Sequence, residues 1–194
     1  MANVIVIYDS CVLYPAPLRD LLMRLALTDL YQAKWTKDIH REWICNLLKN
    51  RPDLLKERLE KTRSKMDLHV RDCLIEGYEE LIDNLKLPDS NDRHVLAAAI
   101  KANAQTIVTY NLSDFPSLAL SKYGVEAQHP DEFLRHLFDL APSKFMHTVE
   151  ETRLSLKYPP KTIEEYLIIL EKQSLPQTVI CLKEYAGLFN ANCA

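Results

Sequence analysis

Glycine is scarce in this chain, and its scarcity excludes one large class of function. Only three of the 194 residues are glycine, namely Gly77, Gly124 and Gly187, so neither GxGxxG nor GxxxxGK occurs. Both motifs need glycine because the backbone must come close to a phosphate group. The sequence therefore excludes nucleotide binding through a glycine-rich loop.

The chain also lacks the spacings that mark zinc sites, disulfide frameworks and serine hydrolases. Its six histidines show no HxxxH spacing, and no serine lies in a GxSxG segment. Its five cysteines form no CxxC pair and are predicted to be reduced thiols. These cysteines are Cys11, Cys45, Cys73, Cys181 and Cys193.

Long apolar runs are absent as well. No segment reaches the roughly 18 residues of a membrane span, and the first residues lack the order of a secretory signal. With 47% hydrophobic and 26% charged residues, the composition is that of an ordinary globular protein. We expect a cytoplasmic protein that does not enter a membrane.

Short β-branched segments alternate with amphipathic ones along the first 140 residues. Predicted strands cover residues 3–8, 73–75, 105–110 and 124–128. Predicted helices cover residues 18–31, 37–50, 52–66, 90–104 and 130–140, with Ser90 or Asn91 as the cap of the fourth. This alternation favours an α/β fold with a central parallel sheet flanked by helices.

The pattern changes near residue 141. From there the sequence shows three helical stretches, divided near "YPPKT" and "SLPQT", and no strand. We therefore predict a domain of residues 1–140 and a helical C-terminal extension of residues 141–194.

Four acids are predicted to meet at one edge of the sheet. Asp9 ends the first strand, Asp114 follows the strand 105–110, and Asp92 begins the helix before that strand. Glu42 lies three positions after the core-facing Ile39 on another helix. Each acid alone has a simpler explanation, as a turn former, a helix-terminal charge or a solvated side chain. Together they would repel one another unless a hard cation such as Mg²⁺ or Mn²⁺ lay between them.

These residues also carry a family resemblance. The segments "IYDSCVLYP", "DIHREW", "LPDSNDRHVLAAAIKANAQTIVTYNLSDFP" and "GVEAQHPDEFL" resemble a PIN domain, the metal-dependent nuclease fold of VapC toxins. The resemblance covers roughly residues 3 to 137 and is most specific in the third segment. It implies a PIN-like fold for residues 1–140.

The resemblance also implies roles for individual residues. It makes four acids catalytic and Mg²⁺- or Mn²⁺-binding: Asp9, Glu42, Asp92 and Asp114. It places supporting polar groups at Ser10, Thr109 and Asn111, with Asp89 as a further candidate or a turn former. Many members have aspartate at the position of Asn111, so the fourth carboxylate must come from Asp114, and metal affinity at a second position is in doubt.

Basic residues gather in one part of the chain although the net charge is only −3. Between Lys34 and Arg71 there are eleven Lys or Arg against six Asp or Glu. Such a basic arm could hold a phosphate backbone, or it could be a solvated face. Candidate RNA-binding residues are Lys34, Lys37, Arg41, Lys56 and Arg63. Trp35 and Trp43 are predicted to pack in the core rather than stack on bases.

The resulting hypothesis is a metal-dependent endoribonuclease that cleaves single-stranded RNA or structured loops. The resemblance further implies a toxin with a small, co-encoded antitoxin protein, and a possible homodimer. Two alternatives stay open: a catalytically weak PIN-like module that binds a protein, and a nuclease specific for DNA or for a nucleic-acid structure.

Overall fold

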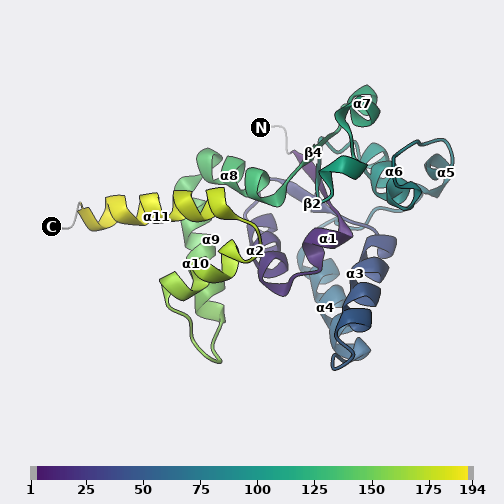
Figure 1. The fold of residues 1–194 in the computed structure, drawn as a ribbon. Coiled ribbons are helices and arrows are strands. Elements are labelled where there is room, and N and C mark those ends of the chain that lie inside the picture. The colour runs from purple at the N-terminus through teal and green to yellow at the C-terminus, as the bar shows by residue number, and fades with distance from the viewer. Residues whose placement is uncertain (1–3, 192–194) are drawn as a thin grey trace.

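The chain folds around a parallel sheet with helices on both faces (Figure 1). The computed structural model describes the backbone of residues 4–191 and the side chains of residues 4–185. The sheet has four strands in the order β2-β1-β3-β4, and every pair is parallel. The strands are β1 (Ile5–Tyr8), β2 (Gln32–Lys34), β3 (Thr106–Val108) and β4 (Glu126–Gln128). The predicted α/β class with a central parallel sheet is confirmed.

Helices connect the strands and continue beyond them. The first part of the chain contains α1 (Ser10–Leu13), α2 (Ala16–Ala26), α3 (Lys37–Asn50), α4 (Lys56–His69), α5 (Glu79–Ile82), α6 (Arg93–Lys101), α7 (Ser117–Leu120) and α8 (Pro130–Leu140). Three further helices follow: α9 (Pro142–Ser155), α10 (Ile163–Glu171) and α11 (Pro176–Ala191). Short 3-10 turns cover Ser90–Asp92, Leu112–Asp114 and Ser121–Tyr123.

The register of the two central strands decides where their polar ends lie. Tyr8 pairs with Val108, and the Asp9 amide continues the ladder by donating to the Val108 carbonyl at 3.1 Å. The residues that follow each strand, Asp9 and Thr109, therefore emerge side by side at the carboxyl edge. In open parallel sheets this edge is where ligands bind.

The two tryptophans are part of the core, as predicted. Trp35 and Trp43 are both fully buried, and the Trp35 ring stacks on Tyr8 with centroids 6.2 Å apart. The Arg19 guanidinium covers the Trp43 ring at 4.7 Å. Neither indole is therefore free to stack on a base.

Several local predictions were wrong. The helix predicted for residues 18–31 ends at Ala26, and the missed strand β2 follows a left-handed residue, Asp29. The predicted strand at residues 73–75 is only a single bridge between Leu74 and Trp35. Asp89, rather than Ser90 or Asn91, caps the turn before α6, because the chain enters that helix through a 3-10 turn.

The C-terminal extension is helical, as predicted, and packs on the sheet domain. Figure 1 shows α9, α10 and α11 on one side of that domain, with α3 and α4 on the other. Helix α9 packs on α2 and α8, and α11 packs on α8. The boundary near residue 140 stays a prediction. In the described part of the chain no helix is both long and apolar enough to span a membrane.

Thr36 gives a test of how α3, the helix that carries Glu42, is anchored. Its fully buried side chain caps α3 by accepting from the Ile39 amide at 3.1 Å. Replacing a capping threonine by alanine removes this acceptor, so Thr36→Ala should lower the free energy of unfolding by about 1 kcal/mol. Urea denaturation measures the change. The matched control is Thr62→Ala, which removes a threonine inside α4 and should cost less than about 0.5 kcal/mol.

Candidate functional site

Asp9 is the buried anchor of the carboxyl edge. Only 2% of its surface is exposed, and its carboxylate accepts three hydrogen bonds. Oδ1 accepts from the Ser10 amide at 2.5 Å, and Oδ2 accepts from Thr109 Oγ1 at 2.7 Å and from Cys11 Sγ at 3.0 Å. These donors offset the cost of removing a charged group from water. Ser10 thus supports Asp9 through its backbone amide.

The segment after β3 supplies the second half of this arrangement. Thr109 is fully buried, and its hydroxyl also accepts from the Asn111 amide at 3.0 Å. Asp114 follows on a 3-10 turn, with its amide donating to the Asn111 carbonyl at 3.0 Å. The Asn111 side chain itself is exposed. The polar residues predicted around Asp9 therefore lie at the same edge, with Thr109 in direct contact.

Glu42 reaches the site from α3, where it meets a histidine from α6. His94 Nε2 lies 2.7 Å from Glu42 Oε1, and the His94 side chain is only 10% exposed. Burial alone would lower the pKa of His94, but the hydrogen bond and charge of Glu42 outweigh that effect and raise it. His94 therefore partly neutralises Glu42.

Asp92 shows that the acids influence one another. Burial raises the pKa of Asp92 from 3.8 to about 7, and the charges of neighbouring carboxylates add to the rise. These neighbours are Asp9, Asp89, Asp114 and Glu42. Asp92 begins α6 but makes no capping hydrogen bond, whereas Asp89 caps the preceding turn. The charges of the other three predicted acids thus act on Asp92, whereas their joint role as one site stays a prediction.

The acids share this edge without forming a closed ligand shell. Among the side chains of residues 4–185, no three from Asp, Glu, His or Cys are close enough together to hold a metal ion. The donor set still fits a hard divalent cation, because it consists of carboxylate oxygens that repel one another. The acids therefore form an open acidic edge and not a complete set of metal ligands.

Comparison with known proteins assigns the fold. Residues 2–113 match the family model described as PIN domain. The chain belongs to the PIN-domain family. Residues 130–184 match a second family, described as the VapC50 C-terminal domain. The resemblance inferred from the sequence segments is therefore confirmed.

One curated relative matches part of the chain. A stretch of 64 residues is 48% identical to "Putative ribonuclease VapC50" of Mycobacterium tuberculosis, covering 33% of this chain and 37% of that protein. The chain thus spans little more than a third of the length of the relative that it matches. No solved structure matches the chain.

The candidate RNA-binding residues are mostly occupied by local partners. Lys37 lies 2.6 Å from Glu76, Arg41 lies 2.8 Å from Asp38, and Arg63 lies 2.9 Å from Glu60. Lys34 donates to the Asp72 carbonyl at 2.7 Å. Lys56 is exposed at the start of α4. These pairs favour the solvated-face alternative for much of the basic arm, and the RNA contacts stay a prediction.

Two residues that contact the site were missed in the sequence. Cys11 touches both Asp9 and Thr109, the latter at 3.4 Å, and burial raises its pKa. His94 was set aside because no second histidine or cysteine stood at a ligand spacing. Their positions in the sequence could have indicated them, because Cys11 and His94 each follow a candidate aspartate by two residues.

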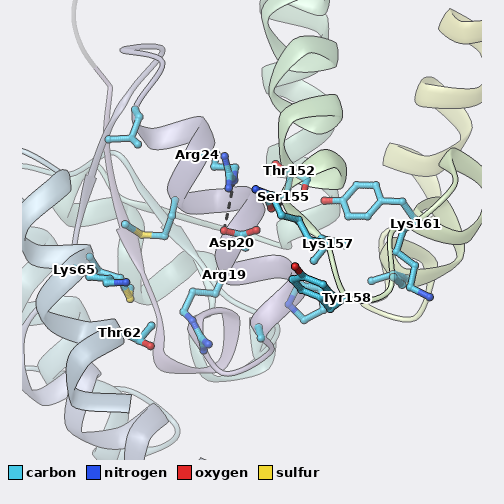
Figure 2. A pocket seen from close by; sticks show the side chains of 18 of the residues that line it. Arg19, Asp20, Arg24, Thr62, Lys65, Thr152, Ser155, Lys157, Tyr158 and Lys161 are labelled. Atoms are coloured by element: carbon cyan, nitrogen blue, oxygen red, sulfur yellow. Dashed lines mark hydrogen bonds and ion pairs between the residues drawn. The ribbon is translucent and has the colours of Figure 1, made fainter. Parts of the chain in front are cut away.

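A separate hollow of about 1260 Å³ lies between the sheet domain and the extension (Figure 2). It is lined from α2, α4, α9 and α10, and none of the four candidate acids borders it. Basic side chains outnumber acids on its walls, and Figure 2 shows Lys65 on the α4 side of the hollow, with Lys157 and Lys161 on the side of the extension. Asp20, the one acid there, pairs with Arg24 at 3.5 Å. The docked extension therefore forms a wall of a basic hollow.

Asp92→Asn tests whether burial and the neighbouring acids make a charged Asp92 unfavourable. Because the folded pKa is about 7 and the unfolded one about 4, protonated Asp92 favours folding below about pH 4. That contribution is lost as pH rises through about 7, so charged Asp92 opposes folding at about pH 8. In EDTA at that pH, Asp92→Asn should be more stable than wild type by about 1 kcal/mol, a value reduced for partial exposure.

Thermal melts in EDTA and in millimolar Mn²⁺ measure this difference. With Mn²⁺ the wild type should become the more stable of the two proteins. Its Asp92 carboxylate binds the ion, and binding to the folded state raises the free energy of unfolding, a gain that Asp92→Asn has lost. The control is Asp83→Asn, which removes an exposed acid elsewhere and should leave both melts unchanged. If Asp92→Asn proved less stable than wild type in EDTA, Asp92 would be an ordinary helix-terminal acid.

Proposed function

We propose that this protein is a metal-dependent endoribonuclease, with Asp9, Glu42, Asp92 and Asp114 as its catalytic acids. The observation that carries the proposal is the placement of buried Asp9 beside Thr109 at the carboxyl edge of the sheet, where burial and the other predicted acids also raise the pKa of Asp92 to about 7. A structural protein gains nothing from keeping such charges together, whereas a nuclease needs them. The PIN-domain match and the similarity to a putative ribonuclease support the same reaction.

The four acids would hold Mg²⁺ or Mn²⁺ and, through it, the scissile phosphate. When bound, such an ion lowers the pKa of water and stabilises the leaving 3′ oxygen. The chain's own contribution is placement: Thr109 Oγ1, Cys11 Sγ and the Ser10 amide fix both oxygens of Asp9. Hydrolysis in this geometry leaves a 5′-phosphate and a 3′-hydroxyl.

Single-stranded RNA is the proposed substrate, in an open strand or a loop, because its flexible backbone can follow an open acidic edge. Lys56 is exposed and has no described ion-pair partner, so it is the predicted basic residue most available to a phosphate. Lys37, Arg41 and Arg63 could serve only by exchanging their carboxylate partners for phosphates, and Lys34 by releasing a backbone carbonyl.

Asp9→Asn is the most direct test of the chemistry. It keeps the size of the side chain and removes the charge, so RNA cleavage in Mg²⁺ or Mn²⁺ should fall on the order of 100-fold or more. Single-turnover cleavage of a labelled RNA measures the rate, and EDTA should abolish it. Asp83→Asn is the active control. Undiminished cleavage by Asp9→Asn would rule out the proposed site, and faster cutting of matched DNA would favour a DNA nuclease.

We further propose that the nuclease acts as a toxin with a small antitoxin encoded beside it, which masks the acidic edge with a basic side chain. Expression should then arrest growth, and co-expression of the neighbouring small protein should restore it. Colony counts after induction measure both effects, with Asp9→Asn as the inactive control. A harmless wild-type protein that binds no neighbouring gene product would contradict the toxin assignment.

A further inference from the structure

Tyr110 connects the acidic edge to the C-terminal extension. It lies between Thr109 and Asn111, where the chain leaves β3. Its backbone amide donates to Cys11 Sγ at 3.2 Å, while its phenol donates to the backbone carbonyl of Gln173 at 2.7 Å. Gln173 lies just beyond the end of α10, so one residue touches both parts of the molecule.

The restraints on the residues after β3 differ in strength. Thr109 is held by its amide, which donates to the Gln128 carbonyl at 3.0 Å. The next amide, that of Tyr110, donates to the sulfur of Cys11. A cysteine sulfur is a weaker hydrogen-bond acceptor than a carbonyl oxygen. The phenol bond to Gln173 is therefore a strong restraint on Tyr110, and it comes from the extension.

The surroundings of Tyr110 favour a fixed orientation. Its half-buried ring packs edge-on against His129, with centroids 5.1 Å apart and planes at 74°. The carbonyl of Gln173 follows the last turn of α10, where carbonyls have no partner further along the helix. The phenol supplies that partner, so the bond serves the end of α10 as well as Tyr110.

A second contact fixes the same part of the extension. Asp131 of α8 is 2% exposed, and its carboxylate caps the start of α11. It accepts from the Gln177 amide at 2.9 Å, and from the Thr178 amide and hydroxyl at 2.8 Å each. The connection between α10 and α11 is thus held at both ends, by Tyr110 and by Asp131, and cannot shift freely relative to β3.

We propose that Tyr110 is a positioning residue through which the extension holds the acidic edge in its active geometry. The Gln173 carbonyl fixes the phenol, the phenol fixes residues 109–111, and Thr109 Oγ1 then stays on Asp9 Oδ2. Small displacements of such groups lower catalytic rates strongly, because the reacting atoms must be held closely. The effect on rate rests on the proposed nuclease activity, whereas the effect on backbone order does not.

Tyr110→Phe is the decisive variant because it removes only the hydroxyl. Hydrogen exchange should show the amides of residues 110 and 111 exchanging about three- to tenfold faster, the factor expected for one lost hydrogen bond. In RNA cleavage kcat should fall by a similar factor with KM unchanged. The matched control is Tyr123→Phe, which removes a hydroxyl with no described hydrogen-bond partner and should change neither measurement.

Asp131→Asn tests the extension from its other anchor. It weakens the cap of α11 without touching the strand or the site, so amides 110 and 111 should again exchange faster, with a fall in kcat. Ser143→Ala is its control, because that variant removes a hydroxyl contact between α9 and Tyr185 inside the extension. Faster exchange in Tyr110→Phe and Asp131→Asn, absent from both controls, supports the proposal.

Other outcomes separate this proposal from the function itself. If Tyr110→Phe speeds exchange only in residues 173–178 and leaves amides 110 and 111 and kcat unchanged, the extension merely docks and the positioning role is wrong. The positioning role is also wrong if KM of Tyr110→Phe rises while its kcat is constant. It is equally wrong if Tyr123→Phe changes exchange and kcat as much as Tyr110→Phe does. If wild type cleaves no RNA, the nuclease proposal fails, and the exchange data still decide whether the extension orders the edge.

Discussion

The hydrogen bond between Thr109 Oγ1 and Asp9 Oδ2 is the contact on which the rest of the acidic edge depends. It joins the first residues beyond two parallel strands, and it forms because the register of β1 and β3 brings those residues level. A buried carboxylate at that point is acceptable only while its donors are in place. The adjacency of β1 and β3, the burial of Thr109 and the hydrogen bond that Thr109 Oγ1 accepts from the Asn111 amide all help to hold this contact in place.

The other acids introduce a conflict that the protein resolves only in part. His94 partly compensates Glu42, and the donors around Asp9 compensate that carboxylate. Asp92 has no compensating cation among these contacts, and burial, together with the charges of the neighbouring acids, raises its pKa to about 7. A charged Asp92 is therefore expected to lower stability, as functional sites often do to their scaffolds. A divalent cation at this edge would remove the conflict.

The sequence predicted the elements whose signals are local. Asp9, Thr109 and Asp114 could be placed because strand ends are marked by β-branched runs and polar residues. Strand β2 could not, since "QAK" has one buried residue and owes its pairing to the neighbouring β1. The pairing of His94 with Glu42 joins residues of two helices, and the partners of the basic arm come largely from side-chain geometry. The His94–Glu42 pair leaves no periodic trace in the sequence, whereas Arg41 with Asp38 and Arg63 with Glu60 stand at the i,i+3 spacing of a helix.

The extension shows why the geometry of the acidic edge need not be set by the sheet domain alone. Its contacts with Tyr110, just after β3, and with Asp131 of α8 are polar and directional, whereas α9 and α10 pack beside α2 around a basic hollow. Apolar packing tolerates small shifts, but a phenol bound to one carbonyl does not. An extension joined in this way transmits its own position to residues 109–111, so a molecule that displaced α10 would also disturb Asp9. Through the hydrogen bonds of Tyr110 and Asp131, the extension thus helps to set the geometry of the acidic edge.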